Sequence, residues 1–257
     1  MAFLQVDFFS NVLGKSMSMN VLLPQTTAGQ IGMEGKGAES YPVLYLLHGR
    51  SDDHTTWMRR TCIERYAAEK GLAVVMPNGD LSFYTNMAHG GDYFTYISEE
   101  IPALCHDFFP RISQKREQTF VAGLSMGGYG AFKLALRLPE RFCFAAALSG
   151  VLDICAFVQR DGRAAIFNHI FENMQTLRGS EEDLLAVAGR LAESGKPRPK
   201  LYAWCGTEDP LVYQDHPGAC AELKRLGYDI TYEESPGDHS WGYWDEQIKR
   251  VIHRLPL

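Results

Sequence analysis

In the stretch 119–127, a serine lies between two glycines directly after a short apolar run. Residues 119–122 (Thr-Phe-Val-Ala) suit a buried strand, and residues 131–136 suit a helix. Between them, Gly123-Leu-Ser125-Met-Gly127 predicts a turn so tight that its flanking positions must lack side chains. Such a turn lifts the serine hydroxyl above the edge of a sheet, so the chain has to build a sheet around it.

A glycine-rich turn before a helix also occurs as a purely structural turn or as a phosphate-binding loop. The five-residue pattern alone is weak, and the interpretation depends on its place between a strand and a helix. Neither Gly-Lys-Ser/Thr nor Gly-x-Gly-x-x-Gly accompanies the turn. We therefore interpret it as a nucleophile elbow, which presents a serine for attack.

The rest of the chain alternates strand and helix patterns. Residues 3–9 and 16–23 predict an antiparallel pair at a sheet edge, and residues 26–40 predict a surface loop. Further strands are predicted at 42–47, 72–76, 119–122, 142–148, 200–205 and 230–234. Helices are predicted at 57–70, at 93–108 with a bend or shortening at Pro102, from the turn to about 138, at 213–226 and at 241–254. This order predicts one α/β domain over residues 1–257, with a mostly parallel sheet and helices on both faces.

Residues 151–199 interrupt this alternation. They contain two helical patterns, at 163–173 and 181–193, and no strand pattern. An insertion at this point would lie over the carboxyl ends of the strands, where open α/β sheets bind ligands. We interpret the segment as a small helical cap, the alternative being helices that only pack at the edge of the sheet.

Composition and charge argue against several classes of partner. The net charge of the 257-residue chain is −6 and basic residues form no run, which argues against nucleic acid or an anionic membrane as a partner. The N-terminus does not resemble a signal peptide, and no apolar run is long enough to span a bilayer. The six cysteines are scattered without a Cys-x-x-Cys pair, which favours reduced thiols in a cytoplasmic protein over disulfides or metal ligands. The sequence leaves open whether the protein forms a homo-oligomer.

A serine hydroxyl needs a base to remove its proton, and the base needs a third group to orient it. On this fold an acid and then a histidine should follow the serine in the chain. Asp209 lies just past the strand at 200–205, and His239 lies between the last strand and the last helix. Both loops should reach the same sheet end as Ser125. The rival acids are Asp153, which opens the cap, Glu208, which should face away, and Asp238, which adjoins the histidine.

Two backbone N–H groups should receive the developing oxyanion. Met126 follows the serine at the start of a helix, and Arg50 follows the strand that ends at His48-Gly49. His48 suits a structural or oxyanion-loop role, and the Arg50 side chain is available for a salt bridge at the rim.

Several aromatic residues lie on loops near the end of the sheet where Ser125 is predicted. The simplest interpretation is that most of them pack in the core. We assign four side chains to the substrate pocket, with core packing or a structural loop role as the alternative for each. They are Trp57, Tyr84, His89 and Trp241.

These motifs together resemble the tributyrin esterase and S-formylglutathione hydrolase (esterase D) group of α/β-hydrolases. The resemblance runs through nearly the whole chain. It includes Phe8-Phe9-Ser10, Met19-Asn20-Val21, Tyr45 to Gly49 with Trp57, Met76-Pro77, Phe83-Tyr84-Thr85, Gly123 to Gly128, Cys205 to Asp209, and His239-Ser240-Trp241 with Trp244.

The resemblance implies an α/β-hydrolase fold and a serine esterase for short acyl chains, acetyl or butyryl esters and acylated sugars among them. It places the triad at Ser125, Asp209 and His239, with no cofactor and no metal. Arg50 stands where an uncharged residue is expected. Cys62 only loosely matches the cysteine of thiol-sensitive relatives. An S-formylglutathione-type thioesterase, a feruloyl or acetyl-xylan esterase, and a non-catalytic binding protein on this fold stay as alternatives.

Overall fold

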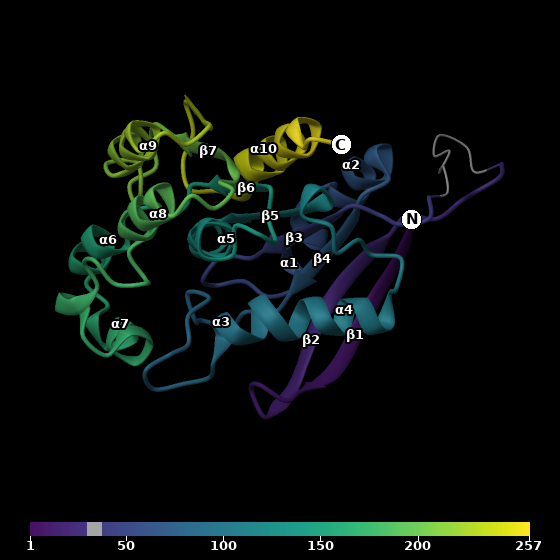
Figure 1. Ribbon diagram of the computed structural model, residues 1–257, viewed down its shortest axis with the longest axis horizontal. Helices are drawn as coiled ribbons and strands as arrows, with labels where there is room; N and C mark the ends of the chain where they lie inside the picture. The colour runs from purple at the N-terminus through teal and green to yellow at the C-terminus, as the bar shows by residue number, and fades with distance from the viewer. Residues whose placement is uncertain (30–37) are drawn as a thin grey trace.

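The computed structural model describes residues 1–29 and 38–257, and within these the strands form one 8-stranded sheet (Figure 1). The order is β1-β2-β4-β3-β5-β6-β7-β8, with β1 Ala2–Ser10, β2 Lys15–Leu23, β3 Val43–Leu47, β4 Ala73–Pro77, β5 Thr119–Leu124, β6 Phe144–Leu148, β7 Lys200–Gly206 and β8 Ile230–Ser235. Strands β3 to β8 pair in parallel, whereas β2 is antiparallel to β1 and β4. The predicted edge pair and mostly parallel sheet are confirmed. Part of the predicted loop at 26–40, residues 30–37, lies outside the described residues.

Helices cover both faces of the sheet, because alternate residues of each strand point to opposite sides. Val43, Tyr45 and Leu47 of β3 join one apolar layer, and Leu44 and Leu46 join the other. The helices are α1 Thr56–Arg60, α2 Ile63–Lys70, α3 Tyr93–Thr95, α4 Ile101–Phe108, α5 Met126–Arg137, α6 Ile154–Arg160, α7 Ala164–Phe171, α8 Leu184–Glu193, α9 His216–Arg225 and α10 Trp241–Arg254, with short turns η1 Tyr96–Glu100, η2 Arg116–Gln118 and η3 Met174–Thr176. Helices α2 and α10 belong to the second layer and α5 to the first.

The single helix predicted at 57–70 is wrong, because the structure has two helices with a break between them. At the break Thr61 is extended, and its hydroxyl donates to the carbonyl of Trp57 at 2.6 Å. The N–H of Cys62 donates to the carboxylate of Asp245 at 2.9 Å. The partner that satisfies the start of α2 thus comes from α10, far away in the sequence.

Pro102 does not interrupt the helical stretch at 93–108. It occupies the second position of α4, directly after the wider π-helical turn η1. The N–H of Ile101 donates to the carbonyl of Tyr96 across this wider turn, so the helical stretch continues, and Pro102, which has no N–H to donate, follows directly after the turn.

Residues 151–199 form α6, α7, η3 and α8, which Figure 1 shows gathered at one side of the molecule with α9. The two predicted helices correspond to α7 and α8. Helix α6 has no counterpart in the sequence prediction. It begins at Asp153, whose carboxylate accepts the N–H of Ala156 at 3.0 Å and so satisfies the helix N-terminus.

A buried ion pair joins this segment to α5. The Lys133 side chain is fully buried and pairs with Glu182, which lies just before α8. The Lys133 ammonium also donates to the Thr85 hydroxyl at 2.8 Å, and the Tyr129 hydroxyl donates to Glu182 at 2.9 Å. Burial lowers the pKa of Lys133 to about 8. Burial alone would raise the pKa of Glu182, but the charge and hydrogen bond of Lys133 outweigh it and hold that pKa below 4.5.

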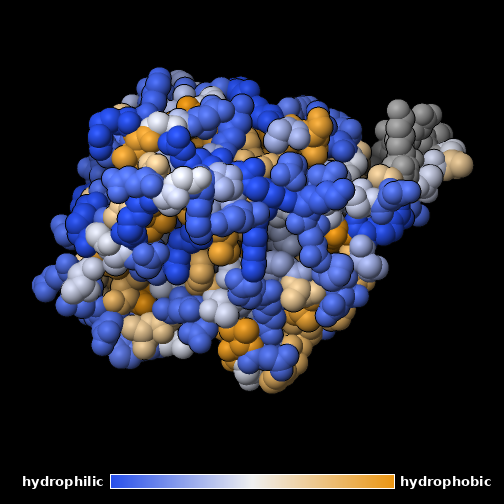
Figure 2. All heavy atoms as spheres, in the orientation of Figure 1, coloured by the Kyte–Doolittle hydropathy of each residue, from blue (hydrophilic) through white to orange (hydrophobic). Residues whose placement is uncertain are grey.

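The outer surface is largely hydrophilic. Figure 2 shows apolar residues in small separate groups on the face seen in Figure 1. Within residues 1–29 and 38–257, no helix combines the length and apolar character needed to cross a bilayer. All six cysteines are free thiols, and four of them are buried.

We expect Glu182→Gln to lower the free energy of unfolding by about 3–5 kcal/mol at neutral pH, because it leaves the Lys133 charge buried without its partner. The folded-state pKa of Glu182 lies below 4.5 and that of Lys133 is about 8, so both groups are charged between these values, and the contribution of the Glu182 carboxylate is lost as the pH falls through its lowered pKa. The difference between variant and wild type, measured by urea unfolding, should therefore shrink at acid pH. Glu181→Gln is the matched control: its exposed carboxylate should change stability by less than about 1 kcal/mol. Equal losses in both variants would contradict the assignment.

Candidate active site

Ser125 lies on a strained turn between β5 and α5. Its backbone φ is 51°, in the left-handed region, and its N–H donates to the carbonyl of Leu148 at 2.9 Å. A Cβ at Gly123 would come within 2.3 Å of the Gly127 carbonyl oxygen, and a Cβ at Gly127 within 2.3 Å of the Leu47 carbonyl oxygen. Both glycines are therefore required for the backbone to pass this close to itself and to β3.

Three side chains form a continuous hydrogen-bonded chain at this turn. The Nε2 atom of His239 lies 3.0 Å from Oγ of Ser125, and its Nδ1 atom lies 2.7 Å from Oδ2 of Asp209. The Asp209 side chain is fully buried, whereas that of His239 is 17% exposed. These distances are within reach for a nucleophile, its base and an orienting acid.

The loops that carry the acid and the histidine are packed against each other. Asp209 follows β7, and its Oδ1 accepts the N–H of Leu211 at 3.0 Å. The N–H of Glu208 donates to the Gly237 carbonyl at 2.9 Å, and a Cβ at Gly206 would come within 2.2 Å of the same oxygen. This contact fixes the spacing between the two loops.

The charge on Asp209 is stabilised by several donors. Burial alone would raise its pKa, but His239, the N–H of Leu211 and the nearby Ser149 hydroxyl outweigh burial and hold the pKa below its usual value. Ser149 is itself buried at the end of β6, where its hydroxyl accepts the indole N–H of Trp244 at 3.2 Å. Trp244 in turn contacts the His239 ring edge-on, with ring centres 4.9 Å apart.

The rival acids lie elsewhere. Asp153 caps α6 and pairs with Arg178 at 3.0 Å, while Glu208 and Asp238 are exposed. His48 is buried: its Nδ1 lies 2.7 Å from the Gly49 carbonyl oxygen, and its Nε2 accepts the N–H of Gly79 at 2.8 Å. It holds the loop after β3 and does not reach Ser125.

Arg50 and Ser125 line the same cavity, and Met126 directly follows Ser125 in the chain. Met126 is the first residue of α5, so its N–H has no acceptor within the helix, and the described residues offer none to Arg50. The Arg50 guanidinium pairs with Asp161, at the end of α6, at 3.3 Å. Its charge is therefore directed toward the 151–199 segment.

A cavity of about 290 Å³ opens at Ser125 and His239. Its polar lining includes Arg50 and Asp52, and burial raises the pKa of Asp52. Its apolar walls include Phe83, Leu124, Phe157, Val212, Trp241 and Trp244. This volume is at the small end of ligand pockets, which generally span about 300–1,000 Å³.

Of the four side chains predicted for the pocket, Trp241 lines the cavity and the other three do not. Trp57 lies behind Trp241, edge-on at 5.0 Å, and its indole donates to the Leu47 carbonyl at 3.0 Å. The buried Tyr84 hydroxyl donates to the His48 carbonyl at 2.9 Å. His89 is exposed and contacts His169 of α7. Two of these aromatic side chains therefore support the site from behind.

Sequence reasoning missed Ser149, Asp52 and Phe157. The predicted strand at 142–148 places Ser149 at the same end of the sheet as Ser125. No feature of the neighbouring sequence indicates that Ser149 contacts Asp209. Asp52 follows the predicted oxyanion loop by two residues, and its carboxylate accepts the Gly49 N–H at 3.2 Å. Phe157 belongs to α6, the helix that the sequence prediction lacked.

The fold and this arrangement define an α/β-hydrolase with a serine at the elbow. In the described part of the chain, no group of three or more His, Cys, Asp or Glu side chains is placed to hold a metal ion.

Comparison with known proteins agrees with this class. The family described as "Putative esterase" matches residues 10–255. An acetyl esterase of Caldicellulosiruptor saccharolyticus is 34% identical, the alignment covering 98% of this chain and 97% of that protein. Two Staphylococcus aureus structures are each 37% identical and cover 99% of this chain and 98% of their own. The fluorophosphonate-binding serine hydrolase FphF has a TM-score of 0.89 and the S-formylglutathione hydrolase FrmB one of 0.87.

The chain belongs to this esterase family, and it is a serine carboxylesterase that acts on esters. The family, fold and reaction class expected from the sequence are confirmed.

We expect Ser149→Ala to lower kcat for ester hydrolysis about three- to tenfold with little change in KM, because Asp209 loses one of its donors. Ser235→Ala is a matched control. Ser235 also accepts a tryptophan N–H, that of Trp204 at 3.2 Å, so its loss removes the same kind of bond away from Asp209. Steady-state kinetics should show kcat within about twofold of wild type for this control. Equal kcat losses in both variants would show that Ser149 contributes only through packing and not as a donor to Asp209.

Proposed function

We propose that Ser125, His239 and Asp209 are the catalytic triad of this esterase. His239 accepts the Ser125 proton on Nε2 while Oγ attacks the ester carbonyl carbon. Asp209 accepts the Nδ1 hydrogen bond, holds the required tautomer and stabilises the imidazolium that forms. The observation that carries the proposal is the unbroken chain of 3.0 and 2.7 Å contacts.

The negative charge that develops on the carbonyl oxygen is stabilised by the N–H groups of Arg50 and Met126. As the tetrahedral intermediate collapses, His239 passes its proton to the departing alcohol and Ser125 keeps the acyl group. Water then attacks the acyl-enzyme with His239 as base, releasing the acid and restoring the Ser125 hydroxyl. Apart from the substrate and this water, the chain supplies every group that the proposed mechanism uses, and the mechanism requires no cofactor or metal.

The proposed substrates are short-chain acyl esters, such as acetyl or butyryl esters of small alcohols and acylated sugars. The small cavity and its aromatic walls support this choice, and so does the likeness to an acetyl esterase. The likeness to FrmB favours one second candidate, an S-formylglutathione-type thioesterase. Cys62, the residue weighed for thiol sensitivity, is exposed and does not line the cavity.

The proposal treats residues 1–257 as one catalytic domain in which residues 151–199 cap the site. Phe157 in the cavity wall and the Arg50–Asp161 pair support the cap. Six unpaired thiols support a cytoplasmic location, with small-molecule esters as the partners.

We expect Ser125→Ala to lower kcat at least about a thousandfold while thermal unfolding stays cooperative, because the nucleophile is lost. Wild-type enzyme quenched during turnover of p-nitrophenyl acetate should carry one acetyl group on the peptide that contains Ser125, detected by mass spectrometry. Ser16→Ala, on the remote β1–β2 hairpin, should retain full activity. Near-normal turnover by the Ser125 variant would refute the mechanism.

A panel of esters graded by acyl length and alcohol size tests the substrate proposal. We expect kcat/KM to be highest for acetyl to butyryl esters and lower for S-formylglutathione and methyl ferulate. Phe157→Ala should raise kcat/KM for a bulkier ester about tenfold relative to the acetyl ester, since it enlarges the cavity. Phe9→Ala, an exposed position on β1, should leave the profile unchanged. A preference for S-formylglutathione would favour the thioesterase instead.

A further inference from the structure

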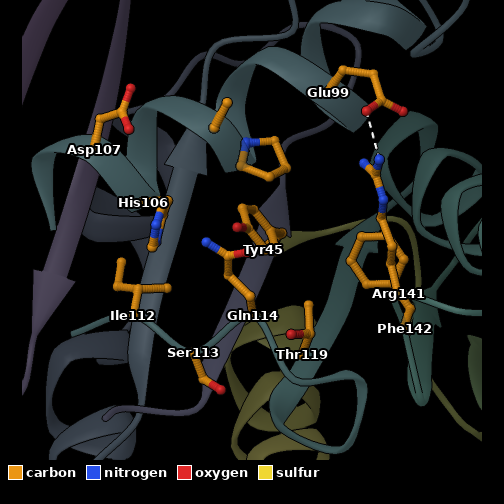
Figure 3. A pocket seen from close by; sticks show the side chains of 12 residues that line it. Tyr45, Glu99, His106, Asp107, Ile112, Ser113, Gln114, Thr119, Arg141 and Phe142 are labelled. Atoms are coloured by element: carbon orange, nitrogen blue, oxygen red, sulfur yellow. Dashed lines mark hydrogen bonds and ion pairs between the residues drawn. The ribbon is translucent and has the colours of Figure 1, made fainter. Parts of the chain in front are cut away.

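A second and larger cavity, of about 410 Å³, lies at the opposite edge of the sheet. It lies toward the amino ends of β3, β5 and β6, next to α4, and Figure 3 shows the side chains that surround it. Thr119, in its lining, is separated from Ser125 by the length of β5, about 20 Å at roughly 3.3 Å per residue. The two cavities share no lining residue.

The lining of this cavity includes a tyrosine whose side chain is largely buried and whose hydroxyl has no partner among the described residues. Tyr45 is 5% exposed and packs edge-on against Phe142, with ring centres 6.2 Å apart. Its hydroxyl makes no hydrogen bond within the described chain, and Figure 3 shows Tyr45 amid the other lining side chains. Burial raises the pKa of Tyr45, so the group remains a neutral donor. Because Tyr45 lines the cavity and its hydroxyl bonds to no described residue, this donor is available to a ligand.

The charged side chains at the rim of this cavity determine which ligand charge is favoured. Arg141 is held by Glu99 at 2.6 Å, the one interaction drawn in Figure 3, so its guanidinium is already neutralised. Asp107 makes no ion pair within the described residues and leaves the rim slightly acidic. An anionic ligand is therefore disfavoured. The exposed Gln114 amide can both donate and accept.

The apolar walls of this cavity determine which ligand shape is favoured. Ile112, Phe142 and Pro102 present apolar surface around Tyr45. A flat ring would bury well against them while an acceptor on the ring substituent meets the Tyr45 hydroxyl. The volume lies within the range of small-molecule sites.

We propose that this cavity binds a small uncharged aromatic molecule bearing a carbonyl acceptor, independently of the catalytic cavity. The probe is benzamide, with benzoate as its charged counterpart. Backbone amide NMR shifts during titration of the whole chain locate binding directly, separating residues 112–119 and 141–142 from residues 49–52 and 124–126.

We expect benzamide to shift the first set of amides with a millimolar Kd, and benzoate to bind more weakly. Tyr45→Phe should weaken benzamide binding about three- to tenfold. Tyr96→Phe is the control, since it removes another tyrosine hydroxyl that lacks a partner, one that is buried and does not line this cavity. Ala103→Trp, at the exposed rim, should block binding without touching the core. The proposal is overturned if the shifts occur only near Ser125, if none occur at about 20 mM benzamide, or if Tyr45→Phe binds like wild type.

Discussion

The close approach of three backbone segments around Ser125 is the constraint on which the rest of the structure depends. Gly123 meets Gly127, and Gly127 meets the carbonyl of Leu47, each at a distance that leaves no room for a Cβ. These contacts press α5 onto the ends of β3 and β5. The same compression holds Ser125 at a positive φ, and the surrounding sheet has to be rigid enough to maintain that strain.

The relative positions of Ser125, Asp209 and His239 could be predicted from the sequence, because the order of the strands determines at which end of the sheet each following loop lies. Parallel strands end at one edge, so a serine after β5, an acid after β7 and a histidine after β8 had to lie near one another. The 3.0 and 2.7 Å contacts match that expectation, although the catalytic roles remain proposals.

What could not be predicted depends on side chains that meet from distant segments. The break between α1 and α2 depends on Asp245, and the Ser149 contact depends on β6 and β7 being neighbours. Trp57 and Tyr84 were expected in the pocket because they are aromatic residues on loops near the site. Their polar atoms instead find carbonyls of the β3 loop, and a local pattern does not show which way such a side chain turns. Helix α6 was missed, and with it the wall supplied by Phe157.

The position of Tyr84 has a consequence for the energetics of turnover. Its ring fills the space beside Gly79 and Gly130, while its hydroxyl holds the carbonyl of His48, two residues before Arg50. The loop that carries the Arg50 amide is therefore ordered by the core when the chain folds, before any ester arrives. Conformational entropy that a mobile loop would lose in every catalytic cycle is lost once here, so the N–H groups proposed to receive the oxyanion would need little reorganisation.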